Sequence, residues 1–159
     1  MRDDALRRSH ADATRVLLLG HSAGAMLAWH LACDRTFGAL AVVAVAGTLV
    51  SSCPALSPPP AFLAVNGGLD LSIPLDGSTR VVPLLGIAPP SVRDSLRVLA
   101  VAGGCQHVSV REGLSDAQGC LGGRPMQLRV LEHAGHSWAE LDGTRAAATF
   151  LHAHVAGIG

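Results

Sequence analysis

The hydrophobic positions of this chain fall into short aliphatic runs, which are separated by stretches rich in glycine, proline and serine. Continuous runs over residues 38–47 and 61–65 are typical of strands buried on both faces of a parallel sheet. A shorter run over residues 15–19 and an alternating segment over residues 126–132 predict two further strands. The sequence therefore predicts a sheet whose central strands are almost wholly apolar.

Helical patterns follow three of these strands. Residues 23–33 are rich in alanine and leucine, and residues 91–102 begin with Ser91 as a potential cap. Residues 137–155 have a helical period, with these expected buried positions: Trp138, Leu141, Phe150 and Leu151. Strands that alternate with helices predict an α/β fold with a mainly parallel sheet.

The remaining segments read as connections. Residues 51–60 are rich in serine and proline, and residues 73–90 are broken by prolines and glycines, so both are expected to be irregular. The hydrophobic content of 49% is normal for a globular protein. We expect residues 1–159 to form a single domain.

Charge and hydropathy exclude several classes of function. Twelve arginines balance twelve acidic residues, so no electrostatic footprint for nucleic acid or for a membrane surface is present. The apolar run over residues 37–53 is shorter than the ~20 residues of a membrane helix. Residues 1–14 are polar and contain no signal-peptide core. As written, the chain is expected to stay in the cytoplasm.

The four cysteines show neither a CxxC spacing nor a zinc-type cluster with histidine, so we expect no metal site. Cys105 and Cys120 each follow a glycine in a loop-like stretch. Two interpretations are open for this pair: a disulfide that closes a short segment, or free thiols in a reducing compartment.

The segment Gly20-His21-Ser22-Ala23-Gly24 has the pattern G-x-S-x-G between a predicted strand and a predicted helix. This context is typical of the strained turn that exposes a nucleophilic serine. We expect side chains at Gly20 or Gly24 to collide with the neighbouring strand or helix. Ser22 is the predicted nucleophile, and the backbone N–H of Ala23 is a predicted oxyanion donor. The alternative is a glycine–serine turn in a helix cap.

A serine hydroxyl needs a base and an orienting acid, and in this type of fold they follow in the order Ser, acid, His. Asp70 follows the strand over residues 61–65, whereas its rival Asp76 sits in a turn sequence where aspartate usually serves the backbone. His136 follows the strand over residues 126–132 and is the predicted base. We expect His133 to be a structural or surface residue, and His21 to shape the pocket rather than transfer protons.

Several segments of the chain resemble the polyhydroxybutyrate depolymerase and feruloyl esterase family, whose members are secreted serine esterases of the α/β-hydrolase fold. The segments that carry the resemblance are Gly24-Ala25-Met26, Leu31-Ala32-Cys33, Val45-Ala46-Gly47-Thr48-Leu49, Asn66-Gly67-Gly68-Leu69-Asp70, Ile73-Pro74-Leu75-Asp76-Gly77, Pro90-Ser91-Val92, Gly104-Cys105, Gly119-Cys120-Leu121-Gly122-Gly123 and Gly135-His136-Ser137-Trp138. The resemblance implies Asp70 as triad acid, His136 as base, an extracellular location, an ester substrate and no cofactor.

The chain also departs from the family's pattern. Asn66 stands where the family usually has histidine and Leu71 where it has proline, so we expect the acid loop to be set less rigidly. The family's domain begins well upstream, whereas this chain starts in what looks like the helix just ahead of the nucleophile strand, so we expect an N-terminally truncated domain. Such a domain would lack one oxyanion donor. It would also leave a sheet edge open to pairing with another chain, which could supply the missing half. The alternatives are another carboxylesterase or peptidase of this fold, or an inert fragment that needs a partner chain.

Overall fold

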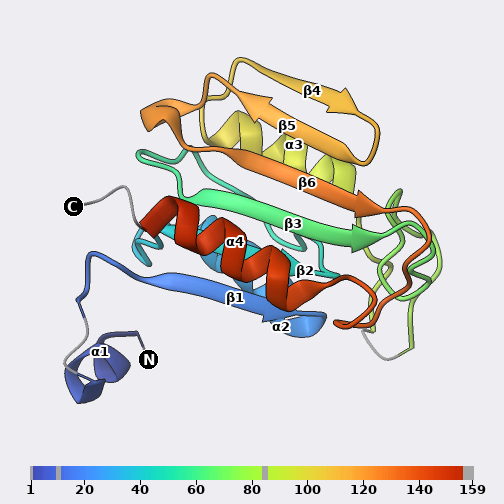
Figure 1. Ribbon diagram of the computed structural model, residues 1–159, viewed down its shortest axis with the longest axis horizontal. Helices are drawn as coiled ribbons and strands as arrows, with labels where there is room; N and C mark the ends of the chain where they lie inside the picture. Colours follow the sequence, from blue (N-terminus) through green and yellow to red (C-terminus); the bar gives the residue numbers. More distant parts are fainter. Residues whose placement is uncertain (1, 10–11, 84–85, 156–159) are drawn as a thin grey trace.

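The computed structural model describes residues 2–9, 12–83 and 86–155. Their strands form one six-stranded sheet in the order β1-β2-β3-β6-β5-β4 (Figure 1). The bounds are β1 Leu17–His21, β2 Ala41–Val45, β3 Ala61–Gly67, β4 His107–Arg111, β5 Leu114–Gln118 and β6 Met126–Leu131. Strands β1, β2, β3 and β6 are parallel, and β5 and β4 add to β6 as an antiparallel hairpin. The predicted α/β arrangement with a mainly parallel sheet is confirmed.

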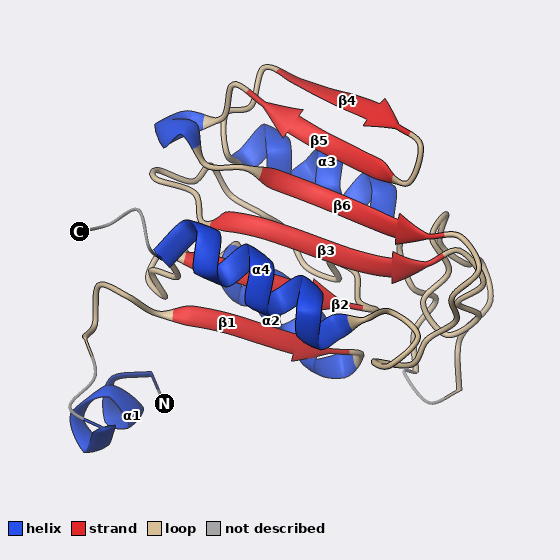
Figure 2. Cartoon of the chain, in the orientation of Figure 1, coloured by secondary structure: helices blue, strands red, loops and turns tan. Residues whose placement is uncertain are grey.

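Helices cover both faces of the sheet (Figure 2). Helices α2 (Ala23–Ala32) and α3 (Val92–Ala102) lie on one face, and α4 (Gly143–Val155) lies on the other (Figure 1). All residues of β2 and β3 are buried, because helices cover these central strands from both sides. Helix α1 (Arg2–Ser9) lies apart from the sheet, and a short 3-10 turn, η1 (Leu121–Gly123), precedes β6.

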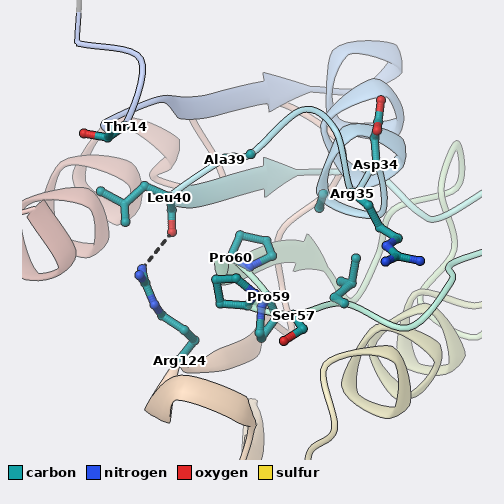
Figure 3. Close-up of a pocket in the computed structure, with 13 residues that line it drawn as sticks. Thr14, Asp34, Arg35, Ala39, Leu40, Ser57, Pro59, Pro60 and Arg124 are labelled. Carbon is teal, nitrogen blue, oxygen red and sulfur yellow. Dashed lines mark hydrogen bonds between the residues drawn. The ribbon is translucent and has the colours of Figure 1, made fainter.

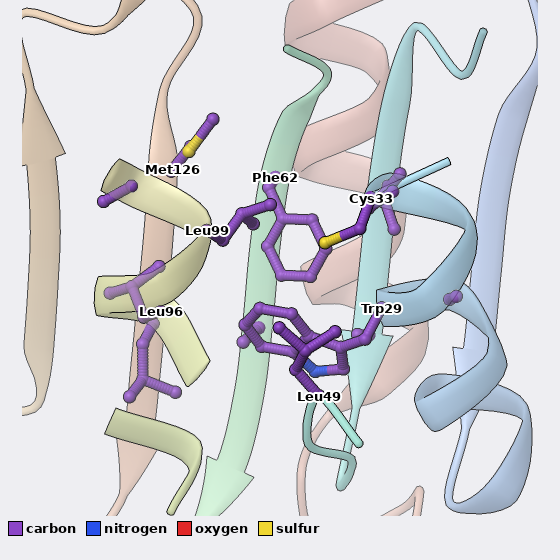
Figure 4. Packing of buried hydrophobic residues seen from close by; sticks show 14 of the residues in the cluster. Trp29, Cys33, Leu49, Phe62, Leu96, Leu99 and Met126 are labelled. Atoms are coloured by element: carbon purple, nitrogen blue, oxygen red, sulfur yellow. The ribbon is translucent and has the colours of Figure 1, made fainter. Parts of the chain in front are cut away.

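Two hydrophobic cores fill the space between sheet and helices. In the core under α2 and α3, the rings of Trp29 and Phe62 lie 4.2 Å apart (Figure 4). The core under α4 contains Leu141 and Phe150, both buried as predicted, while Trp138 and Leu151 are half-buried at its margin. These cores fix the strand ends from which the candidate site is built.

The helix predicted over residues 137–155 is wrong in its first part, since α4 begins only at Gly143. Asp142 adopts a left-handed φ of 48°, which an α-helix does not allow, and residues 138–142 form turns instead. By contrast, the predicted cap of α3 is confirmed, because the Ser91 hydroxyl accepts a hydrogen bond from Asp94 N–H at 3.1 Å.

The hairpin of β4 and β5 was not among the predicted strands. Its two strands mix apolar and polar residues, and its turn places Gly113 at a positive φ of 66°. Most of its side chains stay at least partly exposed, so the hairpin lacks the apolar run by which the inner strands were recognised.

Both pairs of cysteines are disulfide-bonded. Cys105 is joined to Cys120, one of the two interpretations left open by the sequence. Cys33 is joined to Cys53, a pair that was not predicted. This second bridge ties the end of α2 to the loop that follows β2.

We expect the double variant Cys33→Ser/Cys53→Ser to unfold more easily than the native chain. The bridge spans 20 residues, and closing a loop of this size is worth about 3 kcal/mol of unfolding free energy. Denaturant unfolding of both proteins measures the difference. Alkylation of the native protein under denaturing, non-reducing conditions should modify no cysteine; alkylation at Cys33 or Cys53 would contradict the bridge.

Candidate active site

Ser22 sits on a sharp turn between β1 and α2. Its backbone has φ 55° and ψ −121°, a strained conformation for a residue with a side chain. The turn is held by a hydrogen bond of 3.0 Å from Ser22 N–H to Val45 O at the end of β2. The turn thus presents the serine hydroxyl beyond the end of the strand, as the motif requires.

The two glycines of this motif differ in their surroundings. A Cβ atom at Gly20 would lie 2.2 Å from Gly24 O, so the strand and the helix meet there too closely for any side chain. A Cβ atom at Gly24 would have nothing within 4 Å. The predicted collision is therefore borne out for Gly20 and wrong for Gly24, whose outward side faces open space rather than the strand.

A chain of hydrogen bonds connects Ser22, His136 and Asp70. The distance from Ser22 Oγ to His136 Nε2 is 2.9 Å, and that from His136 Nδ1 to Asp70 Oδ2 is 2.8 Å. A buried carboxylate can only accept, so Nδ1 carries the proton and donates it to Asp70. This tautomer leaves the lone pair of Nε2 facing the serine hydroxyl, which is the arrangement of a general base.

The Asp70 carboxylate is fixed by the backbone of its own loop. Its Oδ1 atom accepts hydrogen bonds from Ser72 N–H and Ile73 N–H, both at 2.8 Å. Buried Asn66 adds a bond of 3.0 Å from its Nδ2 to Ile73 O, which fastens the far end of the loop. Asn66 thus holds one end of the acid loop, whereas the Leu71 side chain is 88% exposed to solvent.

Close backbone contact brings the acid loop and the base loop together. A Cβ atom at Gly67 would lie 2.2 Å from Gly135 O, so only glycine permits this approach. Leu69 N–H donates to Ala134 O at 3.0 Å across the same contact. The two loops therefore form one unit that carries Asp70 and His136.

The other candidates lie outside this hydrogen-bonded chain. Asp76 is exposed and pairs with Arg93 Nε at 3.1 Å, and His133 is exposed at the surface. His21 does belong to the site, because its Nε2 lies 2.9 Å from the backbone oxygen of His136. Ala23 begins α2, where the first helical N–H groups have no partner within the helix.

A separate cavity of about 310 Å³ lies at the opposite, amino-terminal end of β2 and β3 (Figure 3). Its walls include Pro58, Pro59 and Pro60, and Arg124, which donates to Leu40 O at 3.2 Å. Ser22, His136 and Asp70 lie at the carboxyl ends of the parallel strands, so this cavity is not part of their site.

Within the described ranges, no group of three or more His, Cys, Asp or Glu side chains is arranged to hold a metal ion. In the same part of the chain, the helices are too short or too polar to span a bilayer.

Comparisons with known proteins give a match in structure but none in sequence. No protein-family model matches the chain, and no curated protein matches its sequence. Among solved structures, the crystal structure of esterase PE8 is similar with a TM-score of 0.55 and 20% identity, over 96% of this chain and 56% of that one. At this identity the likeness shows the fold alone: an α/β arrangement like that of an esterase. The chain spans little more than half of that structure's length.

Proposed function

We propose that the chain is a serine hydrolase of the α/β-hydrolase fold that acts on carboxylic esters through an acyl-enzyme. The observation that carries this proposal is the hydrogen-bonded chain from Ser22 through His136 to Asp70. These residues come from the ends of three parallel strands and are far apart in sequence. A serine on a strained turn, a base in the right tautomer and a buried acid are the parts that acyl transfer needs.

The reaction proposed for this site has two halves. Ser22 Oγ attacks the ester carbonyl while His136 Nε2 takes the hydroxyl proton, and the buried Asp70 carboxylate stabilises the imidazolium that forms. His136 then gives the proton to the leaving alcohol, and an acyl group remains on Ser22. Water, deprotonated by His136, attacks this acyl group, releases the carboxylic acid and restores the serine hydroxyl.

The negative charge on the carbonyl oxygen needs hydrogen-bond donors. We assign one of them to Ala23 N–H, which sits at the start of α2 directly after the nucleophile. No cofactor has a step in this reaction. The described residues supply no second donor that we can assign.

For the substrate, we propose esters of the kind cleaved by polyhydroxybutyrate depolymerases and feruloyl esterases. The support is the sequence resemblance, whose segments include Asp70 and His136 and begin two residues after Ser22. The two disulfides support an extracellular location for the working protein, because such bridges persist in oxidising compartments. A small-molecule carboxylesterase or a peptidase is the alternative, and hydrolysis of a polyester film, a feruloylated sugar, a short-chain ester and a peptide amide would separate them.

The proposal is tested by labelling the purified chain with a fluorophosphonate probe, which reacts with activated serines regardless of substrate. We expect one label per chain, located at Ser22 by peptide mass spectrometry, and none in the Ser22→Ala variant. Circular dichroism and the unfolding midpoint of both proteins serve as the control for folding. The absence of label on a folded native chain would contradict the proposal.

The alternative of a fragment that needs a partner chain is favoured by one feature of the sheet. Strand β1 is one of the two edge strands of the sheet in the described residues, and its Leu17 and Leu19 side chains are 38% and 51% exposed. An apolar edge of this kind is open to pairing with another strand. If a partner is required, the purified chain should self-associate or remain unlabelled until that partner is added. A labelled, stable monomer in size-exclusion chromatography would rule it out.

A further inference from the structure

The loop that carries His136 has to cross part of the sheet to reach the nucleophile. His136 follows β6, whereas Ser22 follows β1, and the strand order places β3 and β2 between them. The segment between β6 and α4 therefore passes over the ends of two strands (Figure 1). A loop with such a span needs contacts to more than one strand end if its imidazole is to stay aligned with the serine.

The start of this loop is anchored to the loop that follows β3 by a backbone hydrogen bond, in which Ala134 O accepts from Leu69 N–H at 3.0 Å. Within the loop itself, Gly135 N–H donates to the side chain of Glu140, Oε2, at 3.0 Å. Two residues after Ala134, a side chain from the end of β1 contacts the loop's backbone: His21 Nε2 lies 2.9 Å from His136 O.

We infer that His21 is a positioning residue that fixes the catalytic base against the nucleophile; this inference rests on the proposed function. A carbonyl oxygen only accepts, so His21 Nε2 must carry a proton and donate it to His136 O. The His21 ring is held in place by neighbouring rings, with centroids 5.3 Å from that of His136 and 5.9 Å from that of Trp138.

The position of His21 in the sequence gives this contact its effect. His21 precedes Ser22 directly, so a movement of the elbow carries the anchor with it. His136 is then held at two points, its backbone oxygen by His21 and its Nδ1 by Asp70, and these fix where Nε2 points. Without the first contact, only the bonds of the imidazole to Asp70 and Ser22 keep it in place, and the backbone of His136 can shift and carry Nε2 away from the serine hydroxyl.

The test uses three single substitutions of His21, to glutamine, asparagine and leucine, and measures the rate of fluorophosphonate labelling at Ser22 in each variant. Glutamine can place its amide N–H where His21 has Nε2–H, whereas asparagine is too short and leucine has no donor. We expect His21→Gln to keep most of the native rate, and His21→Asn and His21→Leu to lose about tenfold or more, because displaced catalytic groups cost at least that much. Thermal unfolding midpoints show whether each variant is folded.

Equal rates for His21→Gln and His21→Asn in folded protein would overturn the inference, as would a native rate for His21→Leu. If His21→Leu does not fold, the comparison of the two amides decides. If the native chain takes up no label, the proposed function fails first. The anchor is then judged by two-bond ¹⁵N–¹H spectra of histidine: protonated Nε2 on His21 supports it, and the Nδ1–H tautomer refutes it.

Discussion

Replacement of Asp70 by asparagine is expected to lower the rate of Ser22 labelling about 10⁴-fold while the chain remains folded, the effect known for the same change in a serine protease triad. The geometry explains why. Oδ1 is held by the N–H groups of Ser72 and Ile73, so the amide oxygen of asparagine must stay there and its NH₂ group must face His136. His136 Nδ1 then has to accept, its proton moves to Nε2, and the lone pair that takes the serine proton is lost.

The matched control for this variant is Asp76→Asn. Asp76 is exposed and its pair with Arg93 is of the surface type, worth about 1 kcal/mol or less. We expect this variant to label at the native rate. Labelling rates over a range of pH, together with unfolding midpoints, separate an effect on the base from an effect on folding. A large loss with Asp76→Asn and none with Asp70→Asn would show that the acid had been assigned to the wrong residue.

The substitution Gly20→Ala is expected to lower the unfolding free energy by about 3 kcal/mol, because a methyl group must be forced into a packed contact. Its Cβ would lie 2.2 Å from Gly24 O and 2.7 Å from Ala25 N. Both are backbone atoms, which cannot relieve the clash by a side-chain rotation. Strand β1 and helix α2 would have to separate, and Ser22 lies between them. We therefore expect the labelling rate to fall as well. Denaturant unfolding monitored by tryptophan fluorescence gives the first quantity.

The control lies within the same motif, at Gly24→Ala. The added methyl group meets no atom within 4 Å, and alanine favours a helix over glycine. The unfolding free energy should stay unchanged or rise by up to about 1 kcal/mol. Equal destabilisation by both substitutions would contradict the distinction between a glycine required by packing and one that is not.

The inner part of the fold was predictable because burial on both faces leaves a plain pattern. Strands β2 and β3 are continuous apolar runs, and the motif around Ser22 falls between a strand and a helix. The hairpin of β4 and β5 escaped prediction because partly exposed strands carry mixed residues. The start of α4 was predicted too early because the helix begins only after Asp142, whose backbone is left-handed. Aspartate tolerates this conformation, but its presence in a sequence does not predict it.

The residue pattern was enough to predict the chemical types in the candidate site and their order along the chain: a serine in a glycine-flanked turn, then an acid, then a histidine. These follow from local rules of backbone strain and reactivity. Three contacts became visible in the folded chain: Asp70 and not Asp76 meets His136, Cys33 pairs with Cys53, and His21 contacts the base loop. Such contacts join residues distant in sequence, and their geometry depends on sheet order and on how closely backbones approach.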